Sequence, residues 1–147
     1  MLSRTFLWPQ GYTSAAMISV NLDAEFYGRI FYPGIDVSEG DIQRLGWTGM
    51  EYGLPHLLDC FREHGVKGTF FIPGRVAELY PDAVRAIADA GHELGCHGYE
   101  HEILAHFTPE EQLELLKKAK AAIEKAAGRA VTGFRMPEGG IPEQTLV

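Results

Sequence analysis

The amino-acid sequence predicts an α/β fold, because one pattern recurs along the chain: a helical stretch, a glycine that ends it, a short β-rich run and a polar loop. Strands that alternate with helices usually pair in parallel through right-handed crossovers. The pattern gives about four strands, which suffice for an open sheet or half of a (β/α) barrel, whereas a complete barrel normally needs roughly 200 residues or more. We therefore expect one domain over residues 1–147 that forms a partial or distorted (β/α) barrel.

The first strand is expected over 17–22, where β-favouring residues occur. A long loop that contains several glycines is expected over 26–47, and such a loop in a compact domain is more often functional than filler. The next elements are, in chain order, a helix over 49–64, a strand over 66–72, a helix over 81–90 and a strand over 93–96.

The third helix has the clearest boundaries. Thr108 can cap its N-terminus, Pro109 suits the first helical position, and Glu111 completes a capping box. Gly128 marks its end, and a fourth strand is expected over 130–134.

Composition excludes several classes of function. The net charge of −7 would repel a phosphate backbone, so a nucleic-acid partner is not expected. No apolar run is long enough to cross a bilayer, and Pro9 interrupts the stretch that a secretory signal would need, so we expect no membrane partner and a cytoplasmic location. The two cysteines, Cys60 and Cys96, indicate no disulfide scaffold and fit a reducing compartment.

Polar side chains follow each predicted strand. In parallel α/β folds, chemistry collects beyond the carboxyl ends of the strands. The four strand ends deliver, in order, Asn21, Asp23 and Glu25; Thr69, Pro73 and Arg75; His97, Glu100 and His101; and Arg135, Pro137 and Glu138. Carboxylates, imidazoles and a guanidinium therefore converge on one rim, which predicts a site there.

Two of these residues have a spacing typical of metal ligands. His97 and His101 are four apart, so on a helical turn they would share a face and both imidazoles could meet one ion. Among six histidines that spacing also arises by chance, so it is a weak signal alone. Together with Asp23 the two histidines form a three-ligand set that leaves positions open for water and substrate. The other histidines are expected at the surface or at helix ends: His56, His64, His92 and His106.

The end of the first strand carries three polar residues, Asn21, Asp23 and Glu25. An aspartate after a strand often only caps a turn. Strand alternation would put all three on one side if the strand runs through them, and that favours a site. Arg135 could simply pair with a surface acid, but its place before Pro137 on the same rim favours an orienting role.

Four runs of the sequence stand out together: V-N-L-D-A-E at 20–25, G-T-F-F at 68–71, G-H-E-L-G-C-H-G-Y-E-H at 91–101 and G-F-R-M-P at 133–137. They resemble the motifs of the polysaccharide deacetylases, which form carbohydrate esterase family four and carry the NodB homology domain. The run that ends in His-x-x-x-His is the specific one, and the arginine–proline run is weak by itself. The resemblance covers the chain from about Met17 to its end.

The resemblance implies a distorted (β/α) barrel and a divalent metal, usually zinc, held by an aspartate and two histidines. Carried over, the ligands are Asp23, His97 and His101, and Arg135 would orient a carboxylate partner or the substrate. The metal would polarise the acyl oxygen and lower the pKa of bound water. The candidate substrate contacts on the same motifs are Asn21, Tyr99 and Pro137.

The first motif departs from the usual family pattern. Most members carry Asp-Asp there, with the first aspartate as general base, whereas this chain resembles a subgroup of cytoplasmic peptidoglycan-deacetylase-like proteins and cyclic imide hydrolases with an Asp-x-Asp-Ala motif. Asn21 stands where that subgroup has its first acid, and an amide takes no proton at neutral pH. The remaining candidates for the base are Glu25, which we favour, Glu138, Glu100 and metal-bound hydroxide.

The second departure is length. The later family motifs, including the histidine that acts as general acid, would lie beyond Val147, so the chain looks truncated at its C-terminus, just where another helix starts. Proton delivery is typically worth 10²–10⁴-fold in rate. A half-barrel also exposes strand edges and apolar helix faces, so we expect a homo-oligomer.

Three functions remain open. The first is a metal-dependent hydrolase of non-peptide carbon–nitrogen bonds that acts on N-acetylated sugars, as in peptidoglycan or chitin, or on small cyclic imides. The second is a degenerate, non-catalytic metal- or sugar-binding domain, which Asn21 and the missing motifs favour. The third is a metal-free member, as in the allantoinase-like branch, whose histidines only hydrogen-bond to substrate.

Overall fold

Four strands form one parallel sheet in the order β1-β2-β3-β4. The structure, a computed structural model, describes residue 9 and residues 11–27 and 38–139. The strands are β1 Ser19–Asn21, β2 Thr69–Ile72, β3 Glu93–Cys96 and β4 Gly133–Phe134. Each strand pairs in parallel with the next along the chain, so the predicted parallel α/β arrangement is confirmed.

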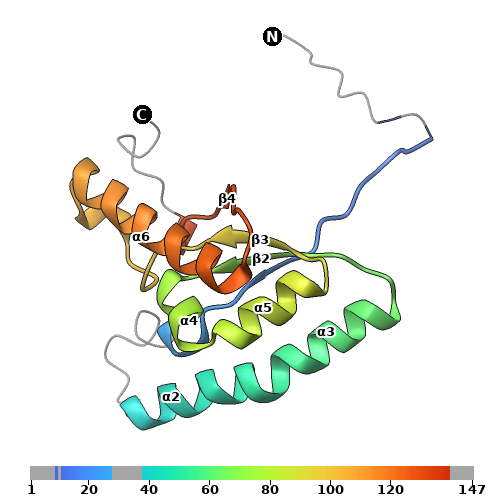
Figure 1. Ribbon diagram of the computed structural model, residues 1–147, viewed down its shortest axis with the longest axis horizontal. Helices are drawn as coiled ribbons and strands as arrows, with labels where there is room; N and C mark the ends of the chain where they lie inside the picture. The colour runs from blue at the N-terminus through green and yellow to red at the C-terminus, as the bar shows by residue number, and fades with distance from the viewer. Residues whose placement is uncertain (1–8, 10, 28–37, 140–147) are drawn as a thin grey trace.

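The helices lie between the strands in sequence, as expected for β-α-β connections (Figure 1). They are α2 Glu39–Thr48, α3 Leu54–Glu63, α4 Gly74–Leu79, α5 Pro81–Asp89 and α6 Pro109–Ala127. Short 3-10 segments are η1 Ala24–Phe26, η3 Leu104–His106 and η4 Pro137–Gly139.

One face of the sheet is packed against helices. Phe70 and Ile72 alternate along β2 and are fully buried, and they join one core with Val84 of α5 and Ile123 of α6. Helices α4, α5 and α6 pack against one another in front of the strands in Figure 1. Phe71 points to the opposite face and is only half-buried, because strand side chains alternate between faces.

Residues 39–63 form one long helical run, in which α2 continues through a π-helical turn, η2 Gly49–Gly53, into α3 (Figure 1). The prediction of a loop over 26–47 is therefore wrong for the part that α2 occupies. Ser38 caps this helix, since its hydroxyl oxygen accepts a hydrogen bond from the amide of Asp41. Most residues of α2 are exposed, so the sequence lacks the apolar period that marks a buried helix face. Residues 28–37 of the predicted loop lie outside the described residues.

The recurring pattern places a polar loop between the strand that ends at residue 72 and the helix that begins at residue 81, and this is wrong because helix α4 lies there. The proline at position 73 has an extended backbone, and the helix begins directly after it at Gly74. By contrast, β3 has the predicted bounds, and the capping box of α6 is confirmed in both directions between Thr108 and Glu111. Gly128 ends α6 in the left-handed conformation, with φ 70°.

Among the described residues, none of the helices is long and apolar enough to cross a membrane. Both cysteines are free thiols, Cys60 exposed and Cys96 buried, as the absence of a disulfide scaffold predicts. The start of the N-terminal stretch and the helix expected near residue 146 lie outside the described residues.

Candidate metal centre

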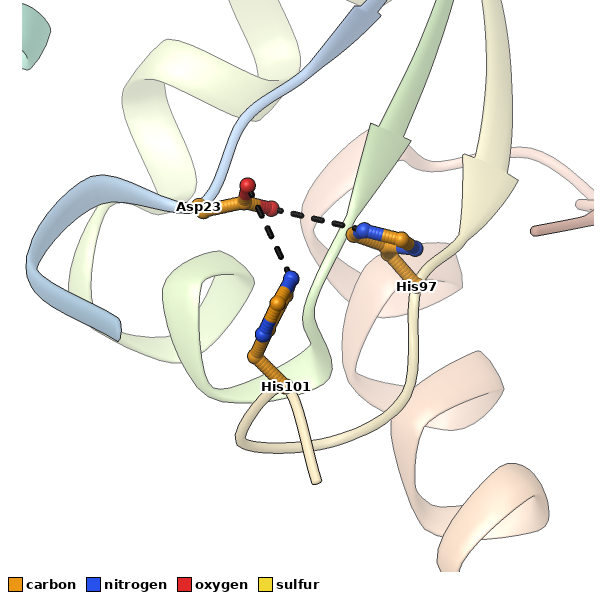
Figure 2. A group of neighbouring side chains, drawn as sticks. All are labelled: Asp23, His97 and His101. Carbon is orange, nitrogen blue, oxygen red and sulfur yellow. Dashed lines mark ion pairs between the residues drawn. The ribbon is translucent and has the colours of Figure 1, made fainter. Parts of the chain in front are cut away.

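Three side chains from two separate strand ends meet at the carboxyl edge of the sheet. Asp23 lies two residues after β1, His97 follows β3 directly, and His101 lies in the loop beyond it. Nε2 of His97 is 3.7 Å from Oδ1 of Asp23, and Nε2 of His101 is 3.8 Å from Oδ2. Figure 2 shows both rings pointing at the carboxylate. The structure thus brings together the three residues that the sequence proposes as ligands, with one potential ligand atom from each lying within 4.8 Å of the other two.

The cluster is buried and its polar atoms are incompletely paired. Asp23 is 8% exposed, His97 1% and His101 2%. Within the described part of the chain, Asp23 Oδ1, His97 Nε2 and His101 Nδ1 have no hydrogen-bond partner. An unsatisfied buried polar group costs about 1–3 kcal/mol. A cation between the carboxylate and the two Nε2 atoms would satisfy two of the three, so the donor set fits a divalent metal.

His97 is held in place by its second ring nitrogen. Nδ1 lies 2.8 Å from the carbonyl oxygen of Arg135, which assigns the ring proton to Nδ1 and leaves Nε2 with its lone pair. Burial lowers the pKa of His97 to about 4. The imidazole is therefore neutral near pH 7, which is the form that binds a metal.

Burial also raises the pKa of Asp23, an effect that His101 opposes and Glu138 reinforces. Burial thus destabilises the ionised form of this carboxylate. A bound cation would offset the cost of desolvating it.

Backbone strain is concentrated around the same cluster. Within the described part of the chain the non-glycine residues with positive φ are Ala24, His101 and Glu138, at 46°, 61° and 59°. Such conformations cost of order 1–3 kcal/mol each and tend to occur at functional sites. His101 therefore does not share a helical turn with His97, and that prediction is wrong: the two rings meet because the loop folds back after β3, with their centroids 4.9 Å apart.

Glu138 approaches the cluster from η4. Its Oε1 lies 3.7 Å from Nδ1 of His101, and its side chain is 25% exposed. Apart from Asp23, Glu138 is the described carboxylate with an ion-pair contact to the imidazole pair.

Arg135 lies on the open face of the sheet. Its guanidinium donates to Oδ1 of Asn21 and to Oγ of Ser19, both at 2.8 Å, and stacks 4.0 Å over the ring of Phe71. The main chain of Arg135 thus supports His97 while its side chain is fixed beside Asn21.

The structure does not bring the remaining predicted residues into the cluster. Strand β1 ends at Asn21, so the expected alternation through Glu25 is wrong, and the Glu25 carboxylate instead accepts a 3.3 Å hydrogen bond from Tyr80. Tyr99 donates its hydroxyl to Glu78 on the side of α4.

Three other expected positions also fall elsewhere. Pro137 is fully buried, and Glu100 is exposed. His92, expected at the surface or a helix end, is buried between Phe61 and Phe70, where its Nδ1 accepts a hydrogen bond from the amide of Gly68.

Sequence reasoning missed two parts of the site. The first is the carbonyl oxygen of Arg135 that holds His97. Every residue has a backbone carbonyl, so the residue type gives no indication that this one is part of the site. The contact of Ser19 with Arg135 depends on the order of the strands and on the register of each neighbouring pair from β1 to β4, which a single sequence does not fix.

Comparison with known proteins gives a consistent result. The family described as polysaccharide deacetylase matches residues 46–147. A peptidoglycan deacetylase of Helicobacter pylori is 38% identical over 106 residues, which are 72% of this chain and 36% of that protein. The chain spans about a third of the length of the curated relatives it matches.

Solved structures agree with the fold. A Mycobacterium smegmatis protein solved as a candidate polysaccharide deacetylase has a TM-score of 0.82 and 31% identity, covering 96% of this chain and 49% of its own. A Bacillus anthracis protein described as a CE4 family pseudoenzyme has a TM-score of 0.62 and 33% identity, over 65% of this chain and 34% of its own. A mutant of that pseudoenzyme is described as having restored enzymatic activity. These likenesses confirm the predicted partial (β/α) barrel. The chain belongs to the polysaccharide deacetylase family.

Proposed function

We propose that this chain is the metal-binding part of a hydrolase that removes acetyl groups from N-acetylated sugars of the peptidoglycan type. The observation that carries the proposal is the convergence of Asp23, His97 and His101 at one buried point with unpaired ligand atoms. The relatives named peptidoglycan deacetylases support the substrate class.

Zinc is the metal that this donor set fits best, since two imidazoles and one carboxylate form a three-ligand site with positions left for water and substrate. When bound, such an ion polarises the acyl oxygen and lowers the pKa of its water toward neutrality. Asp23 would supply the negative charge that balances the cation, and His97 and His101 would each supply an imidazole nitrogen.

Two polar residues at the same edge of the sheet, Asn21 and Arg135, would bind and orient the substrate. The guanidinium of Arg135 is fixed by Ser19, Asn21 and Phe71, so it can orient an acceptor group without reorganising. Asn21 beside it can donate or accept a hydrogen bond but cannot act as a base.

A second function is favoured by one specific observation. Asn21 stands at the position of the first acid in the resembling subgroup, and the chain is similar to a pseudoenzyme of the same family. The alternative is a domain that binds metal and sugar without turnover.

The test combines metal analysis with two turnover assays on the full chain. We expect about one zinc per chain by elemental analysis, and its loss in Asp23→Ala but not in His106→Gln, a control at an exposed histidine. Acetate release from N-acetylglucosamine oligomers supports the hydrolase, and ring opening of a succinimide-type substrate would move the assignment to cyclic imides. Stoichiometric metal with neither activity supports the binding domain. Acetate release that persists in Asp23→Ala and in chelator contradicts any metal-dependent reading.

A further inference from the structure

The two imidazoles of the cluster use their nitrogens in the same way. Each ring turns Nε2 toward Asp23, as Figure 2 shows, and each turns Nδ1 away from it. The outward nitrogen of His97 has an acceptor at 2.8 Å, the carbonyl of Arg135. The outward nitrogen of His101 is buried and has no hydrogen-bond partner within the part of the chain that the structure describes.

Glu138 is placed to be that missing partner. Its Oε1 lies 3.7 Å from Nδ1 of His101, less than 1 Å beyond a normal charge-assisted hydrogen bond. Its charge also acts on Asp23, which lies on the other side of the His101 ring. A small rotation of the Glu138 side chain would close the gap.

The backbone of Glu138 supports a role for its side chain. The residue has φ 59° and ψ 7°, a conformation that glycine or asparagine adopts more readily than glutamate. The neighbouring Pro137 and Gly139 lie in the same short segment, η4, which begins two residues after Arg135. The turn therefore places a carboxylate over His101 at a conformational cost that a glycine would avoid.

We propose that Glu138 is a positioning residue that accepts a hydrogen bond from Nδ1–H of His101 and so holds its Nε2 lone pair toward the metal. The proposal rests on the metal site proposed above. A carboxylate behind a ligating imidazole fixes its tautomer and ring orientation and raises its basicity as a ligand. His97 is oriented by the main chain and His101 by a side chain, so only the second support can be removed by substitution.

Two variants separate this role from folding. Glu138→Gly removes the carboxylate while relieving the backbone, so the variant should fold at least as well as the parent chain. Glu138→Gln keeps an acceptor oxygen without the charge and should restore part of the effect. The control is Glu110→Gln, an exposed glutamate in the first turn of α6.

The first readout is zinc affinity by competition with a chromogenic chelator. We expect Glu138→Gly to weaken zinc binding by about 10- to 100-fold, the usual effect of losing such a partner. Glu138→Gln should lie in between, and Glu110→Gln should match the parent chain. Unchanged affinity in Glu138→Gly overturns the proposal.

The second readout is the tautomer of His101 by ¹⁵N–¹H long-range NMR correlation, recorded with and without zinc. In the zinc-free spectra we expect Nδ1–H for His101 in the parent chain and a mixture of tautomers in Glu138→Gly, while His97 keeps Nδ1–H in both. The zinc-loaded spectra are the reference, because a ring that binds zinc through Nε2 carries its proton on Nδ1 in either protein. If the parent chain binds no zinc, the proposed function fails, and the zinc-free spectra still decide whether Glu138 orients His101. A His101 that keeps Nδ1–H in the zinc-free spectrum of Glu138→Gly refutes the inference.

Discussion

His97 is held by the main chain of Arg135: its Nδ1 lies 2.8 Å from the Arg135 carbonyl oxygen. The residue that follows β3 is thus oriented by the residue that follows β4. The side chain of Arg135 points elsewhere, to Asn21 and Ser19. Arg135 therefore supports the cluster of Asp23, His97 and His101 through its backbone, and contacts the open face of the sheet through its guanidinium.

Replacing the Arg135 side chain should separate these two roles. In Arg135→Met the carbonyl remains, so zinc stoichiometry and affinity should stay within about twofold, while acetate release should fall about 10-fold or more because a positioned guanidinium is lost. Arg135→Lys should rescue little, since lysine lacks the planar fork that bonds two partners at once. Elemental analysis and turnover on the same samples give the answer. Loss of zinc from Arg135→Met would show that the side chain supports the cluster after all.

Asn21→Asp should raise activity. The substitution puts a carboxylate where the resembling subgroup has its first acid, and Arg135, 2.8 Å from Asn21 Oδ1, would keep that carboxylate ionised. A general base contributes typically 10²–10⁴-fold, and we expect at least about 10-fold faster acetate release. Asn21→Ser, which offers no carboxylate, is the control. Equal rates for the three proteins would place the base elsewhere.

Local chemistry made part of this fold predictable. The capping box of Thr108 and Glu111 and the glycine stop at 128 fixed α6 without any tertiary information, and the alternation of short β-rich runs with helices predicted the parallel sheet. The convergence of Asp23, His97 and His101 was predictable because residues at the carboxyl ends of parallel strands share one edge.

Tertiary interactions decided the rest. His101 takes a left-handed backbone that nothing in its neighbours' residue types demands, and Glu25 turns to Tyr80 because β1 ends at Asn21. Helix α2 was not predicted because most of its residues are exposed and show no apolar period. The burial of His92 was not predicted because a single sequence does not distinguish a buried histidine from an exposed one.

Two glycines of the long helical run should respond in opposite ways to alanine. A Cβ at Gly46 would lie 2.4 Å from the backbone nitrogen of Glu25, next to the turn that carries Asp23, whereas a Cβ at Gly49 would meet nothing within 4 Å. Gly46→Ala should cost about 1–3 kcal/mol of unfolding free energy through overpacking and should also weaken zinc binding. Gly49→Ala, whose backbone is helical, should gain about 0.5–1 kcal/mol and leave zinc binding unchanged. Urea denaturation and the chelator assay measure both, and a neutral Gly46→Ala would mean that η1 can shift without disturbing Asp23.

His92, which lies outside the cluster of Asp23, His97 and His101, should make the stability of the fold sensitive to acid. Burial lowers the pKa of its imidazole, with a smaller contribution from Lys67. The neutral ring accepts a hydrogen bond from the amide of Gly68. The unfolded chain binds a proton at this residue below about pH 6.5 while the folded chain does not, so the unfolding free energy should fall as pH drops through that value.

In His92→Phe the acid-sensitive group is gone but the Gly68 amide is left unpaired, at a cost of about 1–3 kcal/mol at pH 7.5. The difference in unfolding free energy between the parent chain and His92→Phe, measured by urea denaturation on zinc-free protein, should therefore be smaller at pH 5.5 than at pH 7.5. The control is His64→Gln, at an exposed position, which should leave the pH dependence of the unfolding free energy unchanged. A difference in unfolding free energy that stays constant with pH would mean that the His92 imidazole takes up its proton equally well in the folded and the unfolded chain.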